Sequence, residues 1–137
     1  MTILIIEESL LIGGRIRNLL AETGAAETVY QSVEHSGAAT VFEKNKPQVV
    51  LLDMCLPGTL PIELLQKIKG SSAGTAVVAL VNCEDYRKQL KCMTIGADYL
   101  LDKYHEFEKI PEIVNSILSK RNLKIINEKP GHYSIFA

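Results

Sequence analysis

Residues 49–58 read Val-Val-Leu-Leu-Asp-Met-Cys-Leu-Pro-Gly: four apolar residues, an aspartate, and then a loop that ends in Pro57-Gly58. The apolar run is too short for a helix and does not alternate with polar residues, which is typical of a β-strand buried on both faces. Similar runs occur at 3–6, 77–81 and 99–101. A more polar, alternating segment at 28–33 predicts a further strand nearer the edge of the sheet.

Segments with helical periodicity alternate with these strands. Their apolar residues recur every three or four positions in 12–20, 38–42, 62–68, 90–93 and 110–118. Gly24, Gly70 and Gly96 are placed to end three of the helices. Pro61 and Pro111 are placed at the start of two. Five repeats of strand and helix predict an α/β fold, in which a five-stranded parallel sheet is doubly wound by helices on both faces.

The composition limits the classes of protein that remain. With 137 residues, of which 47% are hydrophobic, the chain has the size of one globular domain. Its 15 basic and 16 acidic residues give a net charge of -1, so direct DNA binding is not expected. No apolar run approaches the ~18 residues of a membrane span, and the first residues lack the basic start of a signal peptide. We therefore expect a cytoplasmic protein that makes no contact with the membrane.

The cysteines and histidines predict neither a metal cluster nor a disulfide framework. They are Cys55, Cys83, Cys92, His35, His105 and His132. Three cysteines without close paired spacing are typical of reduced thiols, and the scattered histidines are expected at the surface. Arg87, Lys88 and Lys91 are expected on a solvent-facing side of a helix. Gly13-Gly14 lacks the spacing of a phosphate-binding loop.

Charged residues follow several of the predicted strands. Glu7 and Glu8 follow the first strand, Asp53 follows the third, and Lys103 follows the fifth. In a parallel sheet of this kind, ligands and chemistry collect at the carboxyl ends of the strands. Carboxylates from separate strands crowd together only if a cation offsets their repulsion, and hard oxygen ligands suit Mg²⁺. The sequence therefore predicts a magnesium site at this edge.

Three motifs carry a resemblance to a known family. They are Ile3-Leu-Ile-Ile-Glu-Glu, Val49-Val-Leu-Leu-Asp-Met-Cys-Leu-Pro-Gly and Gly96-Ala-Asp-Tyr-Leu-Leu-Asp-Lys. In this order and spacing they resemble the receiver domains of two-component response regulators, over about residues 2–120. The resemblance implies that Asp53 is the phosphoacceptor and that Glu7 and Glu8 are the acidic pair that binds Mg²⁺. It also implies that the backbone carbonyl of Cys55 is a metal ligand and that Lys103 contacts the phosphoryl group.

The resemblance has further implications for fold and partners. It implies a flavodoxin-like sheet with strand order 2-1-3-4-5, and a histidine kinase or phosphotransfer protein as phosphoryl donor. Residues 1–121 are expected to form the receiver domain, whereas residues 122–137 are too short for an output domain. The signal is then expected to pass by contact with a downstream protein target or by further phosphotransfer. No enzymatic activity beyond self-phosphorylation and self-dephosphorylation is expected, and a homodimer is left open.

Several positions depart from the family pattern. Val81 stands where the family has a switch Thr or Ser, and valine has no hydroxyl to bond a phosphoryl oxygen. Leu100 occupies the usual place of the switch aromatic residue, with Tyr99 one position before it. Glu8 replaces the more frequent Asp, and Tyr104 replaces a proline. Two hypotheses therefore remain: a phosphorylatable receiver, and a pseudo-receiver that binds its partners without phosphate.

Overall fold

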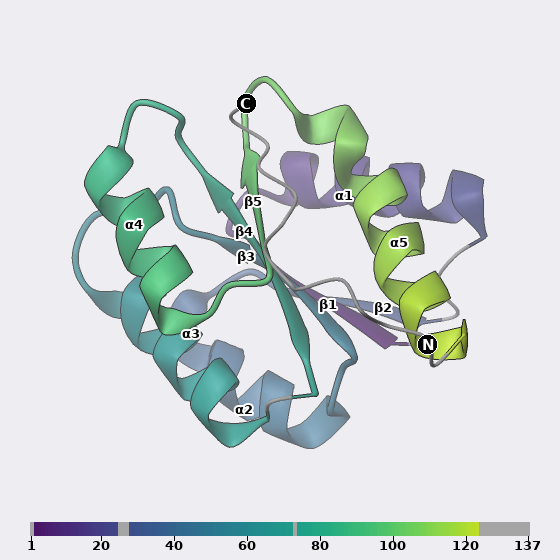
Figure 1. The fold of residues 1–137 in the computed structure, drawn as a ribbon, viewed down its shortest axis with the longest axis horizontal. Helices are drawn as coiled ribbons and strands as arrows, with labels where there is room; N and C mark the ends of the chain where they lie inside the picture. Colours follow the sequence, from purple (N-terminus) through teal and green to yellow (C-terminus); the bar gives the residue numbers. More distant parts are fainter. Residues whose placement is uncertain (1, 25–27, 73, 124–137) are drawn as a thin grey trace.

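One parallel sheet of five strands forms the centre of the molecule (Figure 1). The computed structural model describes residues 2–24, 28–72 and 74–123. The strands are β1 (Thr2–Ile6), β2 (Thr28–Ser32), β3 (Val49–Asp53), β4 (Ala76–Val81) and β5 (Tyr99–Asp102). They are hydrogen-bonded in the order β2-β1-β3-β4-β5. The predicted fold class and strand order are therefore confirmed.

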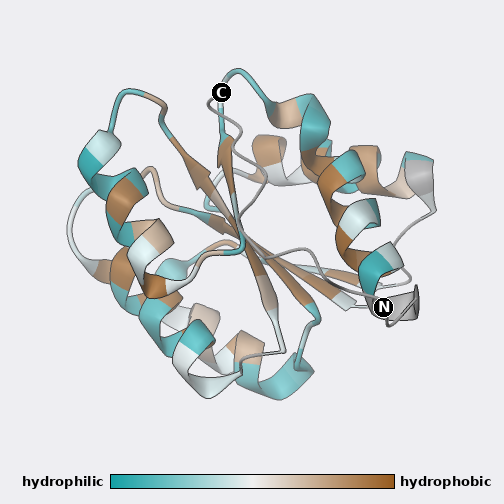
Figure 2. Ribbon diagram, viewed as in Figure 1, coloured by the Kyte–Doolittle hydropathy of each residue, from teal (hydrophilic) through white to brown (hydrophobic). Residues whose placement is uncertain are grey.

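Helices cover both faces of the sheet. They are α1 (Leu10–Thr23), α2 (His35–Asn45), α3 (Leu60–Ser71), α4 (Tyr86–Ile95) and α5 (Ile110–Leu123), with a short 3₁₀ turn, η1 (Phe107–Lys109), before α5. Helices α1 and α5 lie on one face, and α2, α3 and α4 lie on the other (Figure 1). This two-sided cover explains why β3 and β4 are buried along their whole length. Figure 2 shows the hydrophobic strands enclosed between helices whose outer sides are polar.

The predicted helix ends agree with the structure to within one residue. Gly24 and Gly96 follow α1 and α4 with φ of 63° and 117°, values that a residue with a side chain rarely adopts. Helix α3 begins at Leu60 and continues through Gly70 to Ser71, so Pro61 is its second residue. At the start of α1, the side chain of Ser9 accepts a hydrogen bond from the backbone N–H of Ile12. The Ser9 cap thus fixes the loop after β1 at the carboxyl end of the sheet, whereas the two glycines lead into β2 and β5 at its amino end.

Helix α5 extends past residue 121, the predicted end of the receiver domain. It continues to Leu123, so it includes the first two residues of the predicted tail. The remainder of that tail, and the hairpin expected there, lie outside the described residues. Within the described part of the chain, no helix combines the length and the apolar character that crossing a membrane requires.

Candidate functional site

Three predicted site residues meet at the carboxyl end of the sheet. The Lys103 ammonium lies 2.8 Å from Glu7 Oε1 and 2.9 Å from Asp53 Oδ2. Both carboxylate side chains are 2% exposed and the lysine side chain is 8% exposed. Glu7 follows β1, Asp53 ends β3 and Lys103 follows β5, so three strands of the sheet place these side chains. The structure therefore brings Glu7, Asp53 and Lys103 together, whereas Glu8 is exposed.

Backbone groups orient the two buried carboxylates. Asp53 Oδ1 accepts a hydrogen bond of 2.9 Å from the backbone N–H of Cys55. Glu7 Oε2 accepts one of 3.0 Å from the backbone N–H of Ser9. Each carboxylate thus has one oxygen bound to a loop N–H and the other bound to Lys103. The loops after β1 and β3 fix the direction in which both acids point.

The charges of this cluster suit a divalent cation. Burial alone lowers the pKa of Lys103, but its hydrogen bonds to Glu7 and Asp53 and their negative charges outweigh burial and hold that pKa above its ordinary value. Lys103 is therefore a fixed positive charge. Two buried carboxylates share this one ammonium, which leaves an excess of negative charge, and Glu8 is the exposed next residue of the chain. Carboxylate and carbonyl oxygens are the ligands that Mg²⁺ prefers, and the donor set fits that ion.

His35 belongs to the surroundings of Asp53, and its predicted surface position is wrong. It is 2% exposed, and its ring Nε2 lies 2.9 Å from the backbone carbonyl of Asp53. A carbonyl only accepts, so Nε2 carries the hydrogen. His35, Ala38 and Phe42 form the buried side of α2. Their spacing of three and four residues is the signal that could have placed this histidine in the core.

Lys88 also contacts the site, contrary to its predicted solvent-facing role. Its ammonium donates hydrogen bonds of 2.8 Å to the Met54 carbonyl and 3.1 Å to the Leu56 carbonyl. These carbonyls flank that of Cys55, the predicted metal ligand. Lys88 therefore connects α4 to the loop that follows Asp53. No sequence pattern indicates this contact, because it depends on how α4 packs beside that loop.

The loop after β1 depends on a glycine. The Gln31 amide donates hydrogen bonds of 3.0 Å to the Glu7 carbonyl and 3.3 Å to the Ser9 carbonyl. A Cβ at Gly13 would collide with the side chain of Gln31. Gly13 therefore serves the close approach of β2 to the acidic loop.

The three predicted switch positions are buried. Val81 ends β4 with no exposed surface, and its carbonyl accepts a hydrogen bond of 2.8 Å from the Lys103 N–H. The Tyr99 hydroxyl lies 3.5 Å from the ammonium of Lys120 on α5. Side chains alternate along a strand, so Leu100 points to the opposite face, which α4 covers. The aromatic ring therefore packs on the α5 side of β5.

The thiol of Cys55 has no reactive character. Burial, together with the negative charge of Asp53, raises its pKa to about 11. It lies 3.8 Å from the Leu80 carbonyl, as a weak hydrogen-bond donor. A thiol with such a pKa is protonated at neutral pH and is a poor nucleophile.

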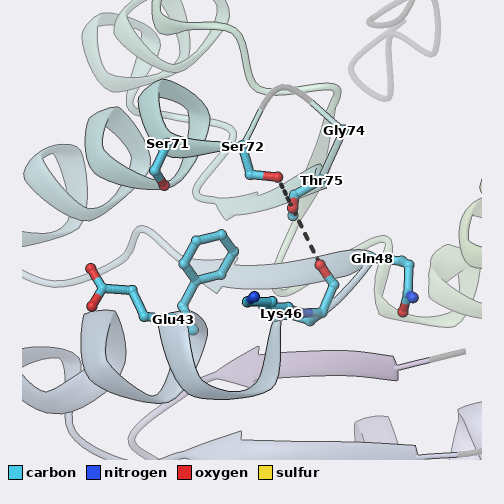
Figure 3. Close-up of a pocket in the computed structure, with 9 residues that line it drawn as sticks. Glu43, Lys46, Gln48, Ser71, Ser72, Gly74 and Thr75 are labelled. Atoms are coloured by element: carbon cyan, nitrogen blue, oxygen red, sulfur yellow. Dashed lines mark hydrogen bonds between the residues drawn. The ribbon is translucent and has the colours of Figure 1, made fainter.

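A cavity of about 510 Å³ lies at the opposite end of the sheet (Figure 3). Its walls come from the ends of α2 and α3 and from the amino ends of β3 and β4. The hydroxyls of Ser72 and Thr75 lie 2.8 Å apart, and Thr75 donates to the Pro47 carbonyl at 3.2 Å. None of the predicted site residues lines this cavity.

The comparisons with known proteins agree with the fold. A family model described as the response regulator receiver domain matches residues 3–115. A curated relative, the uncharacterized transcriptional regulatory protein YbdJ of Bacillus subtilis (strain 168), is 27% identical over 116 residues, which cover 84% of this chain and 50% of the relative. The chain thus spans about half the length of that relative.

Solved structures show the same fold. The signal receiver domain of the DNA binding response regulator protein merR from Colwellia psychrerythraea 34H has a TM-score of 0.78 at 19% identity, covering 87% of this chain and 98% of that one. A response regulator receiver domain protein from Clostridium thermocellum has a TM-score of 0.76 at 23% identity, covering 90% of this chain and 98% of that one. At these identities the likeness concerns the fold alone.

Proposed function

Because the chain belongs to the response regulator receiver domain family, whose model matches residues 3–115, we propose that Asp53 accepts a phosphoryl group from a histidine kinase or a phosphotransfer protein. The observation that carries this proposal is the contact of Lys103 with both Asp53 and Glu7. This contact supports a site in which the Asp53 carboxylate lies beside the permanently protonated ammonium of Lys103. The family's place in two-component signalling supplies the class of donor.

The transfer joins an Asp53 carboxylate oxygen to phosphorus. As that O–P bond forms, the P–N bond of the phosphohistidine breaks, its electron pair stays with the imidazole, and an acyl phosphate results. Glu7, Glu8, Asp53 and the Cys55 carbonyl would hold Mg²⁺, which offsets the negative charge of the phosphoryl oxygens when bound. Lys103, already 2.9 Å from Asp53, adds a second positive charge to those oxygens.

Acetyl phosphate tests this proposal directly. Incubation with Mg²⁺ should add one phosphoryl mass to the intact protein, and Asp53→Asn should remove the adduct. Asp85→Asn is the matched control, because asparagine preserves the helix cap that Asp85 forms at α4. A wild type that stays unmodified, or an adduct that persists in Asp53→Asn, would contradict the assignment.

A pseudo-receiver is the second candidate, and the observation that favours it is Val81. This residue is fully buried at the end of β4 and offers no hydroxyl to a phosphoryl group. A domain of this kind would bind its partner with or without phosphate. Equal partner affinity for the wild type and for Asp53→Asn would favour it, whereas a loss of affinity in Asp53→Asn favours the phosphorylation-dependent function.

The exposed side of α4 suits a protein partner. Tyr86, Leu90 and Met93 are 72%, 64% and 57% exposed, and their spacing places them along one stripe of the helix. We propose that this stripe contacts the downstream protein target. Leu90→Glu should weaken that contact, and a homodimer through the same stripe would be detected as a concentration-dependent mass that Leu90→Glu abolishes.

The domain limits and cellular location are part of the same proposal. Residues 1–121 would act as the receiver, with no direct DNA contact of their own, which the net charge of -1 of the whole chain supports. Cys55, Cys83 and Cys92 are free thiols, which supports a reducing compartment such as the cytoplasm.

A further inference from the structure

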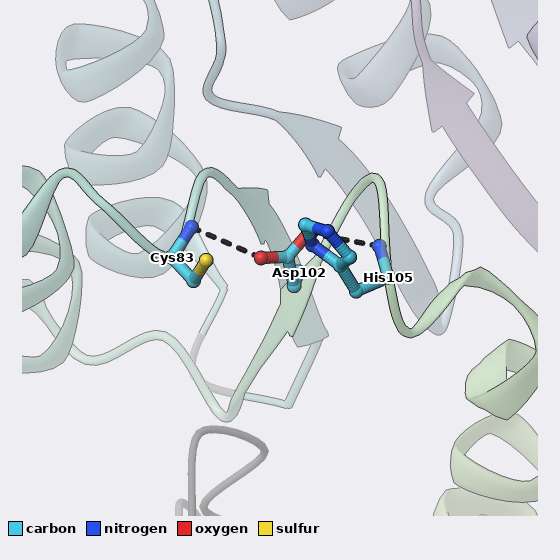
Figure 4. A group of neighbouring side chains, drawn as sticks. All are labelled: Cys83, Asp102 and His105. Atoms are coloured by element: carbon cyan, nitrogen blue, oxygen red, sulfur yellow. Dashed lines mark hydrogen bonds and ion pairs between the residues drawn. The ribbon is translucent and has the colours of Figure 1, made fainter.

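A second cluster of potential ligands lies beside the phosphoacceptor site. It consists of Cys83 in the loop after β4, Asp102 at the end of β5, and His105 in the turn after β5 (Figure 4). Their thiol sulfur, carboxylate oxygen and ring nitrogen all lie within 4.8 Å of one another. The His105 Nδ1 is 3.2 Å from Asp102 Oδ1. Two loops that are separate in sequence thus direct three different donor types at one point.

We propose that Cys83, Asp102 and His105 form a binding site for a divalent transition-metal ion, with Zn²⁺ as the best match. Thiolate, imidazole and carboxylate are the three ligand types that zinc uses in proteins. Mg²⁺ prefers oxygen donors and does not select a thiolate, so this site and the cluster of Glu7 and Asp53 differ in the metal they favour. Three protein ligands leave a fourth position of a tetrahedral site open to water.

Asp102 is held in place before any metal binds. It is 2% exposed, and its oxygens accept backbone hydrogen bonds from Cys83 at 3.1 Å, Tyr104 at 2.7 Å and His105 at 3.0 Å. Two of these N–H groups belong to the other two ligand residues. Hydrogen bonds to a ligating carboxylate fix its orientation and increase metal affinity. The backbone therefore brings all three donors to one side of Asp102.

The cluster can exchange the proton of the Cys83 thiol for a metal ion. Burial raises the pKa of Asp102, but hydrogen bonds from Cys83, Tyr104 and His105 outweigh burial and hold that pKa well below its usual range. The hydrogen bond to Asp102 raises the pKa of the Cys83 thiol. A metal ion would release that thiol proton to solvent, and the thiolate and carboxylate would then balance its two positive charges.

The distances require only a small adjustment. Zinc holds its ligands at about 2.0 to 2.3 Å, so the ligand atoms of a tetrahedral site lie roughly 3.3 to 3.7 Å apart. His105 and Asp102 are already at 3.2 Å. The His105 side chain is 74% exposed and can rotate without disturbing the core. Binding would join the β4–α4 loop to the turn that follows Lys103.

Cobalt titration of the untagged full chain tests this site without any phosphorylation. Co²⁺ bound by a thiolate gives an intense near-ultraviolet charge-transfer band, and we expect that band to saturate at one ion per chain. Zn²⁺ should then displace the cobalt. Cys83→Ser should abolish the band, and His105→Ala should weaken Co²⁺ and Zn²⁺ affinity by about 10- to 100-fold or more. Cys92→Ala, which removes a thiol outside the cluster, should leave the band unchanged.

Two further measurements distinguish binding at Cys83, Asp102 and His105 from binding at Glu7 and Asp53. Millimolar Mg²⁺ and the Asp53→Asn variant should leave the cobalt band and the zinc affinity unaltered. Since His105 is exposed, His105→Ala should retain the wild-type circular dichroism, which separates loss of a ligand from loss of the fold. Absence of the band, a band that persists in Cys83→Ser, or zinc binding that Mg²⁺ or Asp53→Asn removes would overturn the proposal.

Discussion

Asp53 and Asp102 are both buried aspartates at the ends of strands, but their partners differ in kind. Asp53 accepts one backbone N–H, from Cys55, and binds the side chain of Lys103. Asp102 accepts three backbone N–H groups and contacts the side chain of His105. A side-chain ammonium can move to a new partner, whereas backbone N–H groups are fixed by the loops that carry them. The comparison indicates that a side chain balances the charge of Asp53, whereas backbone groups hold Asp102 and the loops around it in place.

The neighbours of Asp53 reinforce this difference. Lys103 is shared between Asp53 and Glu7, so it keeps one carboxylate partner when Asp53 changes its charge. Asp102 has no such substitute among the described contacts, since the N–H groups of Cys83, Tyr104 and His105 all converge on its two oxygens. Replacement of Asp53 should therefore change the free energy of unfolding little, whereas replacement of Asp102 should lower it.

The largest effect is expected for Asp102→Ala. It leaves three backbone N–H groups without their acceptor, and hydrogen bonds to a charged group contribute roughly 1.5 to 3 kcal/mol each without being additive. We expect the free energy of unfolding to fall by about 3 to 5 kcal/mol in urea titrations. Asp53→Asn, which keeps an acceptor for Cys55, should change it by less than about 1 kcal/mol. Equal losses for both variants would remove the distinction between the two aspartates.

The next effect concerns Lys103→Met. This change leaves Glu7 and Asp53 as buried carboxylates without a counter-charge, and breaking a buried ion pair from one side costs about 3 to 5 kcal/mol. We expect a loss near the lower value, because the next residue, Glu8, is exposed and water can therefore approach this edge of the sheet. Mg²⁺ should restore part of the lost stability by binding the folded state, and should do so less in the double variant Lys103→Met, Asp53→Asn. Urea titrations with and without Mg²⁺ measure both expectations; a variant as stable as the wild type would show that Lys103 does not balance these charges.

The stability that Asp102 contributes should depend on pH in the acid range. The pKa of Asp102 is depressed in the folded protein, so its contribution to stability is fully present above its unfolded pKa of about 3.9 and is lost as the pH falls below that value. The stability difference between the wild type and Asp102→Asn should therefore be constant near neutral pH and should shrink below about pH 4. Urea midpoints from pH 7 to pH 2 measure this difference. A gap independent of pH would mean that the charge of Asp102 contributes nothing.

The sequence predicts one of these aspartates better than the other, for a physical reason. Asp53 follows a fully apolar strand, and parallel strands bring their carboxyl ends to one edge, so its meeting with Glu7 and Lys103 follows from topology alone. The contacts of His35, Lys88 and Asp102 depend on helix packing and on the course of short loops. Neither property has a period or a spacing in the sequence. His35 is a partial exception, because its spacing from Ala38 and Phe42 indicates that it lies on the buried side of α2.

The smallest effect is expected at Val81. It tests whether a change at Asp53 alters the conformation of distant residues. A ligand shifts a two-state equilibrium only by its different interactions with the two states, and valine provides no hydrogen bond to a phosphoryl oxygen. A charge-assisted hydrogen bond contributes roughly 1.5 to 3 kcal/mol, which is the coupling that the missing hydroxyl removes.

Beryllofluoride, a phosphoryl mimic, should therefore produce large amide chemical-shift changes near Glu8, Asp53 and Lys103 and small ones around Tyr99, whose ring packs toward Lys120 on α5. Val81→Thr should enlarge the distant changes, because its hydroxyl adds the missing link. Val81→Ala, which supplies no hydroxyl, is the control and should leave them small. Large changes along β5 in the unaltered protein would contradict this prediction, because they would show that the switch does not need the hydroxyl.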